Sequence, residues 1–282
     1  MSARRIAVVG HVEHVTLGRI AGVVAAGDVV HLSDARFVPG GGGGIAFAQL
    51  CQSDAEIHLF TAVGSDDAGR AVERRIRAHH AGARVHVHAA VRAVDHPRVV
   101  VVVDRDGRRT IIVTHEPLHP AASDPLPWST LADCDAVYFT GTDPESLRLA
   151  RAAPLLVVTA RRSAALLAAS VAPDVIIGSV EDPRENRELA AYQPAPRALV
   201  LTDGPRAVRV YRGTEVSRVD PPPGPEHVVG DYGAGDSFAA AMTFFLAHAP
   251  SVEEACRRAG PFGAAVLRGL DPLEGQIPLF AP

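Results

Sequence analysis

Short apolar runs alternate with longer amphipathic stretches along most of the chain. The apolar runs are short enough for strands and rich in Val, Ile and Leu, and they cover residues 5–10, 56–63, 136–140, 155–159, 175–177 and 198–202. Stretches with helical spacing cover residues 45–52, 67–80, 145–152, 163–170, 183–192, 237–249 and 252–267. Strands that alternate with helices pair in parallel, so the pattern predicts an α/β fold: a doubly wound, mostly parallel sheet with helices on both faces.

Two β-rich segments interrupt this rhythm. Residues 28–38 alternate as an exposed strand does, and Asp106-Gly107 is a hairpin turn signal. Further strands are predicted at residues 84–91, 98–104, 109–114, 207–211 and 215–219. We expect a small β lid built from two separate segments, residues 11–38 and 85–115. The α/β core then takes the remainder, residues 1–10, 39–84 and 116–282.

Composition and charge exclude several classes of protein. The net charge of −4 gives no signature of nucleic-acid binding. No stretch reaches the roughly 18 apolar residues of a membrane span, and the first residues lack the apolar core and cleavage site of a signal peptide. The three cysteines are far apart and match neither a disulfide framework nor a zinc motif. We therefore expect a cytoplasmic protein with no membrane or nucleic-acid partner.

All 28 basic residues are arginines, so the chain contains no lysine. This excludes the P-loop lysine, the strand lysine of protein kinases and every mechanism that uses a Schiff base. If the protein handles phosphate, it must do so with backbone N–H groups, arginine or a metal ion.

The segment GDYGAGDSF, residues 230–238, places glycines and a carboxylate directly before an apolar helix. The glycines permit positive φ, and the N–H groups of Gly233, Ala234 and Gly235 converge at a helix N-terminus, which favours an anion. Two interpretations stay open. Either Asp236 caps the helix, or the amides hold a phosphoryl group while Asp236 accepts a proton from an attacking hydroxyl. A dinucleotide-binding G-x-G-x-x-G does not fit, because Phe238 stands at the third glycine.

Five motifs along the chain point to one family. Residues 231–236 match D-T-x-G-A-G-D, one residue shorter, and 41–48 match G-G-x-G-A-N-x-A. Residues 64–69 match G-x-D-x-x-G, 106–110 match D-G-E-R-T, and 202–204 match T-x-G. Together these motifs resemble the ribokinase-like carbohydrate kinases of the PfkB family over nearly the whole chain. The resemblance implies the family fold, a doubly wound sheet with a small β lid.

The resemblance also implies transfer of the γ-phosphoryl group of ATP to a hydroxyl of a small sugar or related metabolite. Asp236 is then the catalytic base, and the amides of Gly233, Ala234 and Gly235 form the anion hole. A nucleoside kinase of the same fold, or a non-catalytic relative that binds a nucleotide or metabolite, is the alternative function.

On the nucleotide side, the resemblance implies contacts from Thr202 and Gly204 to ATP and an apolar border to the adenine near Gly263. The resemblance further implies that Mg²⁺ bridges the phosphates and that Glu181 orders water on that ion. The other interpretation of Glu181 is a charge at a helix N-terminus.

The substrate side departs from the family pattern. Val15 stands where relatives place a sugar-binding Asp, and Ala46 replaces the Asn of the glycine-rich motif. The candidate substrate contacts are Asp236, Glu13, Gly41, Gly42 and Arg109. Glu13 is equally well interpreted as a solvated loop charge. Ribose or fructose is therefore not assumed as the acceptor.

Three further expectations concern ions, assembly and histidines. Tyr232 replaces a Thr that helps some relatives to bind a monovalent cation, which puts such a site in doubt here. Exposed edges of the lid strands favour a homodimer through the lid. His11 and His14 flank Glu13 without matching a zinc motif. His86 and His88 share one face of a predicted lid strand and are interpreted as lid surface.

Overall fold

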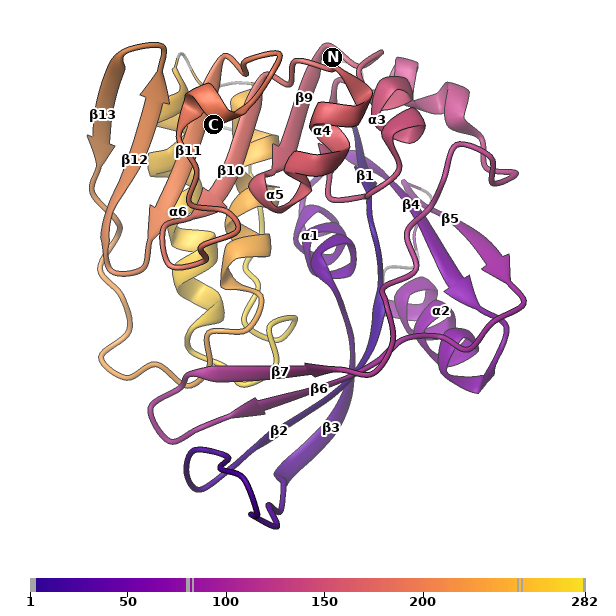
Figure 1. Ribbon diagram of the computed structural model, residues 1–282, viewed down its shortest axis with the longest axis vertical. Coiled ribbons are helices and arrows are strands. Elements are labelled where there is room, and N and C mark those ends of the chain that lie inside the picture. Colours follow the sequence, from indigo (N-terminus) through magenta and orange to yellow (C-terminus); the bar gives the residue numbers. More distant parts are fainter. Residues whose placement is uncertain (1–3, 80–81, 83, 248, 250, 281–282) are drawn as a thin grey trace.

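The computed structural model describes residues 4–79, 82, 84–247, 249 and 251–280. Residues 1–3, 80–81, 83, 248, 250 and 281–282 of the predicted core lie outside these ranges. They include His80 of the predicted helix 67–80 and His248 of the predicted helix 237–249. The described chain forms a large sheet covered by helices and a smaller sheet beside it (Figure 1). This is the predicted α/β architecture.

The large sheet has nine strands in the order β13-β12-β11-β10-β9-β8-β1-β4-β5. Their bounds are β1 (Arg5–Val9), β4 (Glu56–Gly64), β5 (Val85–Arg92), β8 (Ala136–Phe139), β9 (Leu155–Thr159), β10 (Val175–Ser179), β11 (Ala198–Asp203), β12 (Arg206–Arg212) and β13 (Glu215–Val219). All neighbours from β5 to β11 pair in parallel, and β12 and β13 add an antiparallel edge.

Helices bury both faces of this sheet. One face packs against α1 (Gly42–Leu50), α2 (Asp67–His79), α5 (Ala234–Leu246) and α6 (Val252–Val266). The other face packs against α3 (Pro144–Ala150), α4 (Ser163–Ala169) and the 3-10 helix at Trp128–Asp133. In the described ranges, no helix is long and apolar enough to cross a membrane.

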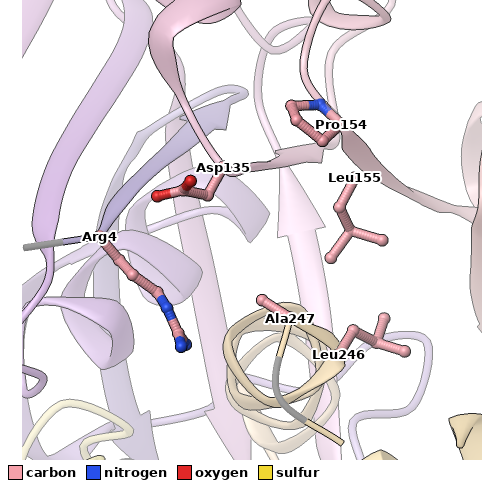
Figure 2. A pocket seen from close by; sticks show the side chains of 6 residues that line it. All are labelled: Arg4, Asp135, Pro154, Leu155, Leu246 and Ala247. Carbon is pink, nitrogen blue, oxygen red and sulfur yellow. The ribbon is translucent and has the colours of Figure 1, made fainter. Parts of the chain in front are cut away.

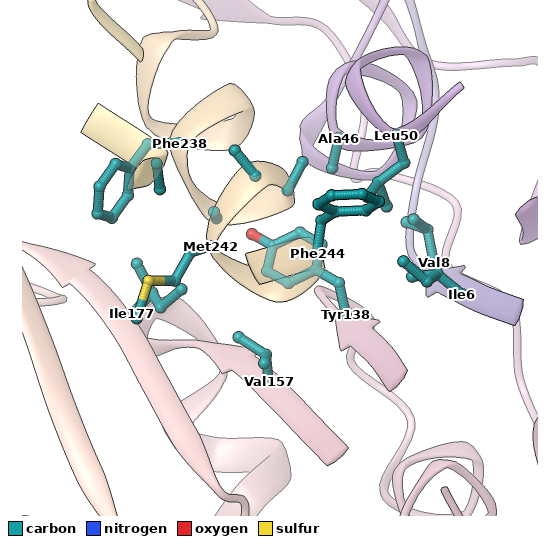
Figure 3. Close-up of a cluster of buried hydrophobic side chains, with 14 of the residues drawn as sticks. Ile6, Val8, Ala46, Leu50, Tyr138, Val157, Ile177, Phe238, Met242 and Phe244 are labelled. Carbon is teal, nitrogen blue, oxygen red and sulfur yellow. The ribbon is translucent and has the colours of Figure 1, made fainter. Parts of the chain in front are cut away.

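Successive residues of the central strands enter different cores. Ile6 and Val8 belong to the core shared with α1 and α5, whereas Ala7 and Val9 belong to the core on the opposite face. Figure 3 shows the first core, where side chains of β1, β8 and β9 meet those of α1 and α5. Burial on both faces explains why these strands read as unbroken apolar runs in the sequence.

The small sheet, called the lid from here on, has the strand order β3-β2-β6-β7. Its strands are β2 (Glu13–Arg19), β3 (Ser33–Gly40), β6 (Arg98–Val103) and β7 (Arg109–Val113). One lid face is apolar and packs against the core chain through Ile45, Tyr232 and Leu270. Every residue of β7 is exposed, so the outer edge of the lid faces solvent.

The structure corrects one boundary of the predicted lid. Residues 85–92 form β5 in the large sheet, where they pair in parallel with β4, so the lid does not begin at residue 85. Val85, Val87 and Ala89 pack against the core under α2, and this burial places β5 in the large sheet. The interpretation of His86 and His88 as lid surface is therefore wrong. β3 also runs to Gly40 and crosses the predicted boundary at residue 38.

The helix predicted at residues 183–192 is absent from the structure. This described segment forms turns and a 3-10 helix at Leu189–Ala191. The Asp182 carboxylate accepts a hydrogen bond from the Arg184 N–H (2.9 Å), and the Glu185 carboxylate accepts one from the Ser179 N–H (3.0 Å). Such side-chain bonds to the backbone compete with helix formation.

Candidate active site

The glycine turn before α5 has the backbone conformation that only glycine adopts readily. Gly233 is the N-cap residue of α5, with φ of 82° and ψ of −1°. A Cβ at this position would lie 2.7 Å from Cβ of Pro272 and 3.1 Å from Cδ1 of Ile45. Gly235, in the first turn, has nothing within 4 Å of an added Cβ. The turn therefore combines a required glycine with open space at the helix N-terminus.

Asp236 stands in the first turn of α5, next to this open space. In the part of the chain that the structure describes, its carboxylate makes no hydrogen bond or ion pair, so Asp236 does not act as an ordinary helix cap. Burial raises the pKa of Asp236 to about 6, while nearby His11 lowers the pKa and nearby Glu185 raises it. A carboxylate with a pKa near 6 is an effective proton acceptor at neutral pH.

The N-terminus of α1 faces Asp236. A Cβ at Gly42 would lie 3.1 Å from Asp236 Oδ1 and 3.2 Å from Thr140 Oγ1. Gly10 and Thr140 directly follow β1 and β8, so Asp236 lies at the carboxyl ends of adjacent parallel strands. Ligands of open α/β sheets bind at this edge of the sheet.

His11 and Glu13 form the next part of the same wall. Glu13 is buried, its Oε1 lies 3.5 Å from His11 Nε2, and a Cβ at Gly41 would lie 3.2 Å from Glu13 Cγ. A Cβ at Gly42 would also lie 3.7 Å from His11 Cε1, so His11 reaches the Asp236 side of the site. The interpretation of Glu13 as a solvated loop charge is wrong, because the side chain is buried.

His11 has spare hydrogen-bonding capacity. Its Nδ1 is buried, and none of the described residues gives it a hydrogen-bond partner. Its ring packs against that of His119, with centroids 4.7 Å apart. His14 stacks instead on Phe37, so His11, Glu13 and His14 do not converge as metal ligands.

Apolar packing between the lid and the core lies next to His11 and Glu13. Val15 is fully buried in the lid core, and Tyr232 packs in the same cluster. The N–H of Gly41 donates a hydrogen bond to the Tyr232 hydroxyl (3.3 Å). Position 15, where the resemblance predicts an Asp, is therefore part of an apolar contact between lid and core.

Arg109 joins the lid to the start of the glycine turn. Its Nη1 lies 2.7 Å from Asp231 Oδ2, and its backbone N–H donates to Asp231 Oδ1 (3.1 Å). The N–H of Asp231 in turn donates to the Gly107 carbonyl (3.1 Å). Arg109 thus holds the lid turn against the core in this structure.

Thr202, Gly204 and Glu181 gather at the carboxyl ends of β10 and β11. Thr202 Oγ1 donates to the Gly178 carbonyl (3.2 Å), and Gly204 has φ of 54° in the turn before β12. A Cβ at Gly204 would lie 3.2 Å from Glu181 Oε1. The Glu181 side chain is 65% exposed and lies 3.9 Å from Arg206. No helix starts at Glu181, so the helix-charge interpretation of this residue is wrong.

Gly263 has a structural role in helix packing. It lies in α6, and a Cβ there would lie 3.1 Å from the Ala234 carbonyl oxygen and 3.3 Å from Cβ of Phe238. The glycine lets α6 approach the first turn of α5 closely. An adenine contact near Gly263 stays a prediction.

Sequence reasoning missed a charged group close to the site. Glu185 is buried, accepts a hydrogen bond from Arg161 Nε (2.9 Å), and raises the pKa of Asp236. Arg162 donates to the Thr140 carbonyl (2.8 Å). The only signal for Glu185 was its position shortly after Glu181. The helix predicted at residues 183–192 concealed that Glu185 turns back toward Arg161 and the end of β10.

Figure 2 shows a separate pocket. It is lined by Arg4, Asp135, Pro154, Leu155, Leu246 and Ala247. These residues precede or begin β1, β8 and β9 or end α5, whereas Asp236 starts α5. This pocket is therefore not part of the Asp236 site.

The fold and the site define a ribokinase-like α/β protein. A family model described as pfkB family carbohydrate kinase matches residues 3–272. The chain therefore belongs to the pfkB family of carbohydrate kinases, which are phosphotransferases that act on hydroxyl groups of sugars.

Solved structures support the same fold. A putative ribokinase from Agrobacterium tumefaciens has a TM-score of 0.79 and 19% identity, covering 98% of this chain and 94% of that one. A probable sugar kinase from Rhizobium etli CFN 42 has a TM-score of 0.75 and 17% identity, covering 96% of this chain and 95% of that one. Adenosine kinase from Sinorhizobium meliloti has a TM-score of 0.71 and 18% identity, covering 96% of each chain. A comparison with curated proteins gave no significant match.

Proposed function

We propose that this protein is an ATP-dependent kinase that transfers the γ-phosphoryl group to a hydroxyl of a small sugar or related metabolite. One observation carries the proposal. The Asp236 carboxylate has no partner among the described residues, has a pKa of about 6, and lies beside open space at the N-terminus of α5. A binding protein has no need for such a base at this point, which is why we prefer a kinase to a non-catalytic relative.

The proposed reaction uses two parts of the site, a base and an anion-binding turn. Asp236 accepts the proton of the attacking hydroxyl, and the free N–H groups of Gly233, Ala234 and Gly235 hold the transferring phosphoryl oxygens. A base in position contributes roughly 10²–10⁴ in rate. The positive end of the α5 dipole favours the same negative charge.

Thr202 and Gly204 are proposed to contact the nucleotide phosphates. Mg²⁺ prefers oxygen ligands and keeps several waters, and the exposed carboxylate of Glu181 beside Gly204 fits that preference. When bound, the ion neutralises charge on the phosphates. Glu185 is engaged by Arg161, which leaves Glu181 as the accessible carboxylate on this side.

The acceptor is proposed to lie between Asp236, the α1 N-terminus and the buried pair His11 and Glu13. Glu13 offers carboxylate oxygens to acceptor hydroxyls, and His11 Nδ1 offers a further polar atom without a partner in the described chain. Gly41 and Gly42 leave room for the acceptor at the α1 N-terminus. Arg109 is proposed to reach the acceptor when its pair with Asp231 opens.

A homodimer through the lid stays a prediction. The edge strand β7 exposes Ile111, Ile112 and Val113, which are 44%, 49% and 49% exposed. An exposed apolar edge of this kind favours pairing with another strand. Sedimentation equilibrium of the wild type and of Ile112→Glu tests it: a monomeric wild type contradicts the dimer.

The test is conversion of ATP to ADP in the presence of Mg²⁺ with a panel of sugars, sugar acids, polyols and nucleosides. We expect acceptor-dependent turnover that falls about 10²–10⁴-fold in Asp236→Asn. Asp54→Asn, an exposed carboxylate outside the site, is the matched control and retains wild-type turnover. Turnover only with nucleosides identifies a nucleoside kinase. ATP binding without turnover on any acceptor, or an active Asp236→Asn, contradicts the proposal.

A further inference from the structure

A second cluster of polar side chains lies at the edge of the large sheet. Glu56 and His58 lie two residues apart on β4, so they share one face, and His86 of β5 is the register partner of His58. His88 is the register partner of Phe60 on the same face. The cluster belongs to the amino-terminal parts of the two strands, whereas Asp236 lies at the carboxyl end of the sheet.

The three side chains converge on one point. His58 Nε2 lies 3.2 Å from Glu56 Oε1, and His86 Nε2 lies 3.3 Å from the same oxygen. The ligand atoms of all three residues lie within 4.8 Å of one another. Zn–N and Zn–O bonds of about 2.0–2.2 Å in a tetrahedron place neighbouring ligand atoms roughly 3.3–3.5 Å apart. The two distances to Glu56 Oε1 are already close to that spacing. A small rotation of the half-exposed His86 brings the remaining ligand atoms within it.

Neighbouring groups hold two of the ligands in orientation. His58 Nδ1 lies 3.2 Å from His88 Nε2, so a hydrogen bond to His88 leaves Nε2 of His58 directed at Glu56. Arg5 Nε donates to Glu56 Oε2 (3.0 Å), which leaves Oε1 for the histidines. Metal sites in proteins use such outer partners to fix the ring orientation of a histidine and the position of a carboxylate.

Burial gives the cluster a closed side and an open side. The side chain of His58 is 7% exposed, that of Glu56 is 23% exposed and that of His86 is 39% exposed. Beneath them, Phe60 stacks on Trp128 with ring centroids 5.2 Å apart. An ion can enter from solvent beside His86, and the apolar floor leaves room for water on the open side only.

We propose that Glu56, His58 and His86 form a Zn²⁺ site with one coordination position open to water. Two neutral imidazoles and a carboxylate are a common ligand set for Zn²⁺ with an open position. Ligands from β4 and β5 mean that the bound ion cross-links the edge strand to its neighbour. The site stabilises the sheet edge and acts independently of phosphoryl transfer.

The test uses tag-free, chelator-treated protein. We expect one equivalent of Zn²⁺ to bind in competition with a chromophoric chelator, and Co²⁺ in its place to give the absorption of a four-coordinate site. Glu56→Gln and His86→Gln should each weaken Zn²⁺ binding by at least about 100-fold. His88→Gln should weaken it by about 10–100-fold, because it removes only the outer partner.

Two controls separate the site from unspecific binding and from unfolding. His31→Gln removes an exposed histidine elsewhere, and Asp236→Asn affects only the proposed active site, so both should bind Zn²⁺ like the wild type. Thermal unfolding without metal shows whether each variant is folded. Added Zn²⁺ should then raise the Tm of the wild type and not that of folded His86→Gln. No equivalent of Zn²⁺ on the wild type, or unchanged binding by folded Glu56→Gln and His86→Gln, overturns the proposal.

Discussion

The two walls of the candidate active site are built in opposite ways. The phosphoryl wall, Gly233 to Asp236, contains a left-handed glycine, open space and a half-buried carboxylate without a partner in the described chain. The lid wall, Val15 with Tyr232, is a packed apolar contact with its hydroxyl hydrogen-bonded. Functional sites hold unfavourable groups that the surrounding structure keeps in place. The phosphoryl wall fits that description, whereas the lid wall resembles an ordinary core.

This contrast separates two kinds of mutational effect. Changes in the phosphoryl wall should alter activity. They should lower stability where they add backbone strain and raise it where they remove the half-buried charge of Asp236. Changes in the lid wall should alter stability first.

The largest effect on stability is expected for Gly233→Ala. The alanine must adopt φ near 82° and its Cβ meets Pro272 at 2.7 Å, so we expect a loss of about 1–3 kcal/mol or more in the free energy of unfolding. Gly235→Ala is the matched control, because open space surrounds its Cβ, and it should gain roughly 0.5–1 kcal/mol.

Urea unfolding of both variants measures this difference. Gly235→Ala should nevertheless lose turnover, because its methyl group occupies space proposed for the phosphoryl group. Equal stability of the two alanine variants would show that the turn does not need a glycine at position 233.

Asp236→Asn is expected to raise the free energy of unfolding, by less than Gly233→Ala lowers it. Burial raises the pKa of Asp236 from 3.8 to about 6, so ionising this carboxylate destabilises the folded state. The penalty is fully present above about pH 6 and disappears as the pH falls toward 3.8. Asp236→Asn should therefore be about 1–2 kcal/mol more stable than the wild type at pH 7.5, a figure reduced for partial solvent exposure.

The check is the difference in unfolding free energy between variant and wild type at pH 7.5 and at pH 4.5. The gain should shrink at the lower pH, and Asp54→Asn should show no such change. A less stable Asp236→Asn at pH 7.5 means that the carboxylate caps α5 and stabilises the fold.

The smallest change in the free energy of unfolding is expected for Tyr232→Phe in the lid wall. This change leaves the Gly41 N–H without its acceptor while keeping the apolar contact with Val15, at a cost of about 1 kcal/mol. Turnover should stay close to the wild-type value. Thermal unfolding and the kinase assay measure the two properties together, and a loss of turnover as large as that of Asp236→Asn would place the hydroxyl in the reaction.

Most of the architecture could be predicted from local patterns. The unbroken apolar runs correctly indicated the parallel strands, and the glycine turn correctly indicated the N-terminus of α5. The resemblance also assigned Asp236, Gly41 and Gly42 to one substrate site, and in the structure a Cβ at Gly42 would lie 3.1 Å from Asp236 Oδ1.

The errors occurred where a segment depends on its partners. Val and His alternate over residues 85–88 at the start of β5, a pattern that suits a half-exposed lid strand as well as the edge strand that this segment forms. Residues 183–192 contain helix-forming residues, yet bonds from the Asp182 and Glu185 side chains to the backbone hold them in turns.

The sequence by itself determined the features that neighbouring residues specify. These are the conformation of the turn at Gly233, the start of α5 and the alternation of strands and helices, since φ preferences and apolar periodicity act over a few residues. The tertiary structure alone decided which strands lie side by side. It brought Glu185 to Arg161 near Asp236 and placed His86 against Glu56 and His58, because those contacts depend on strand order and register, which packing of the whole sheet fixes.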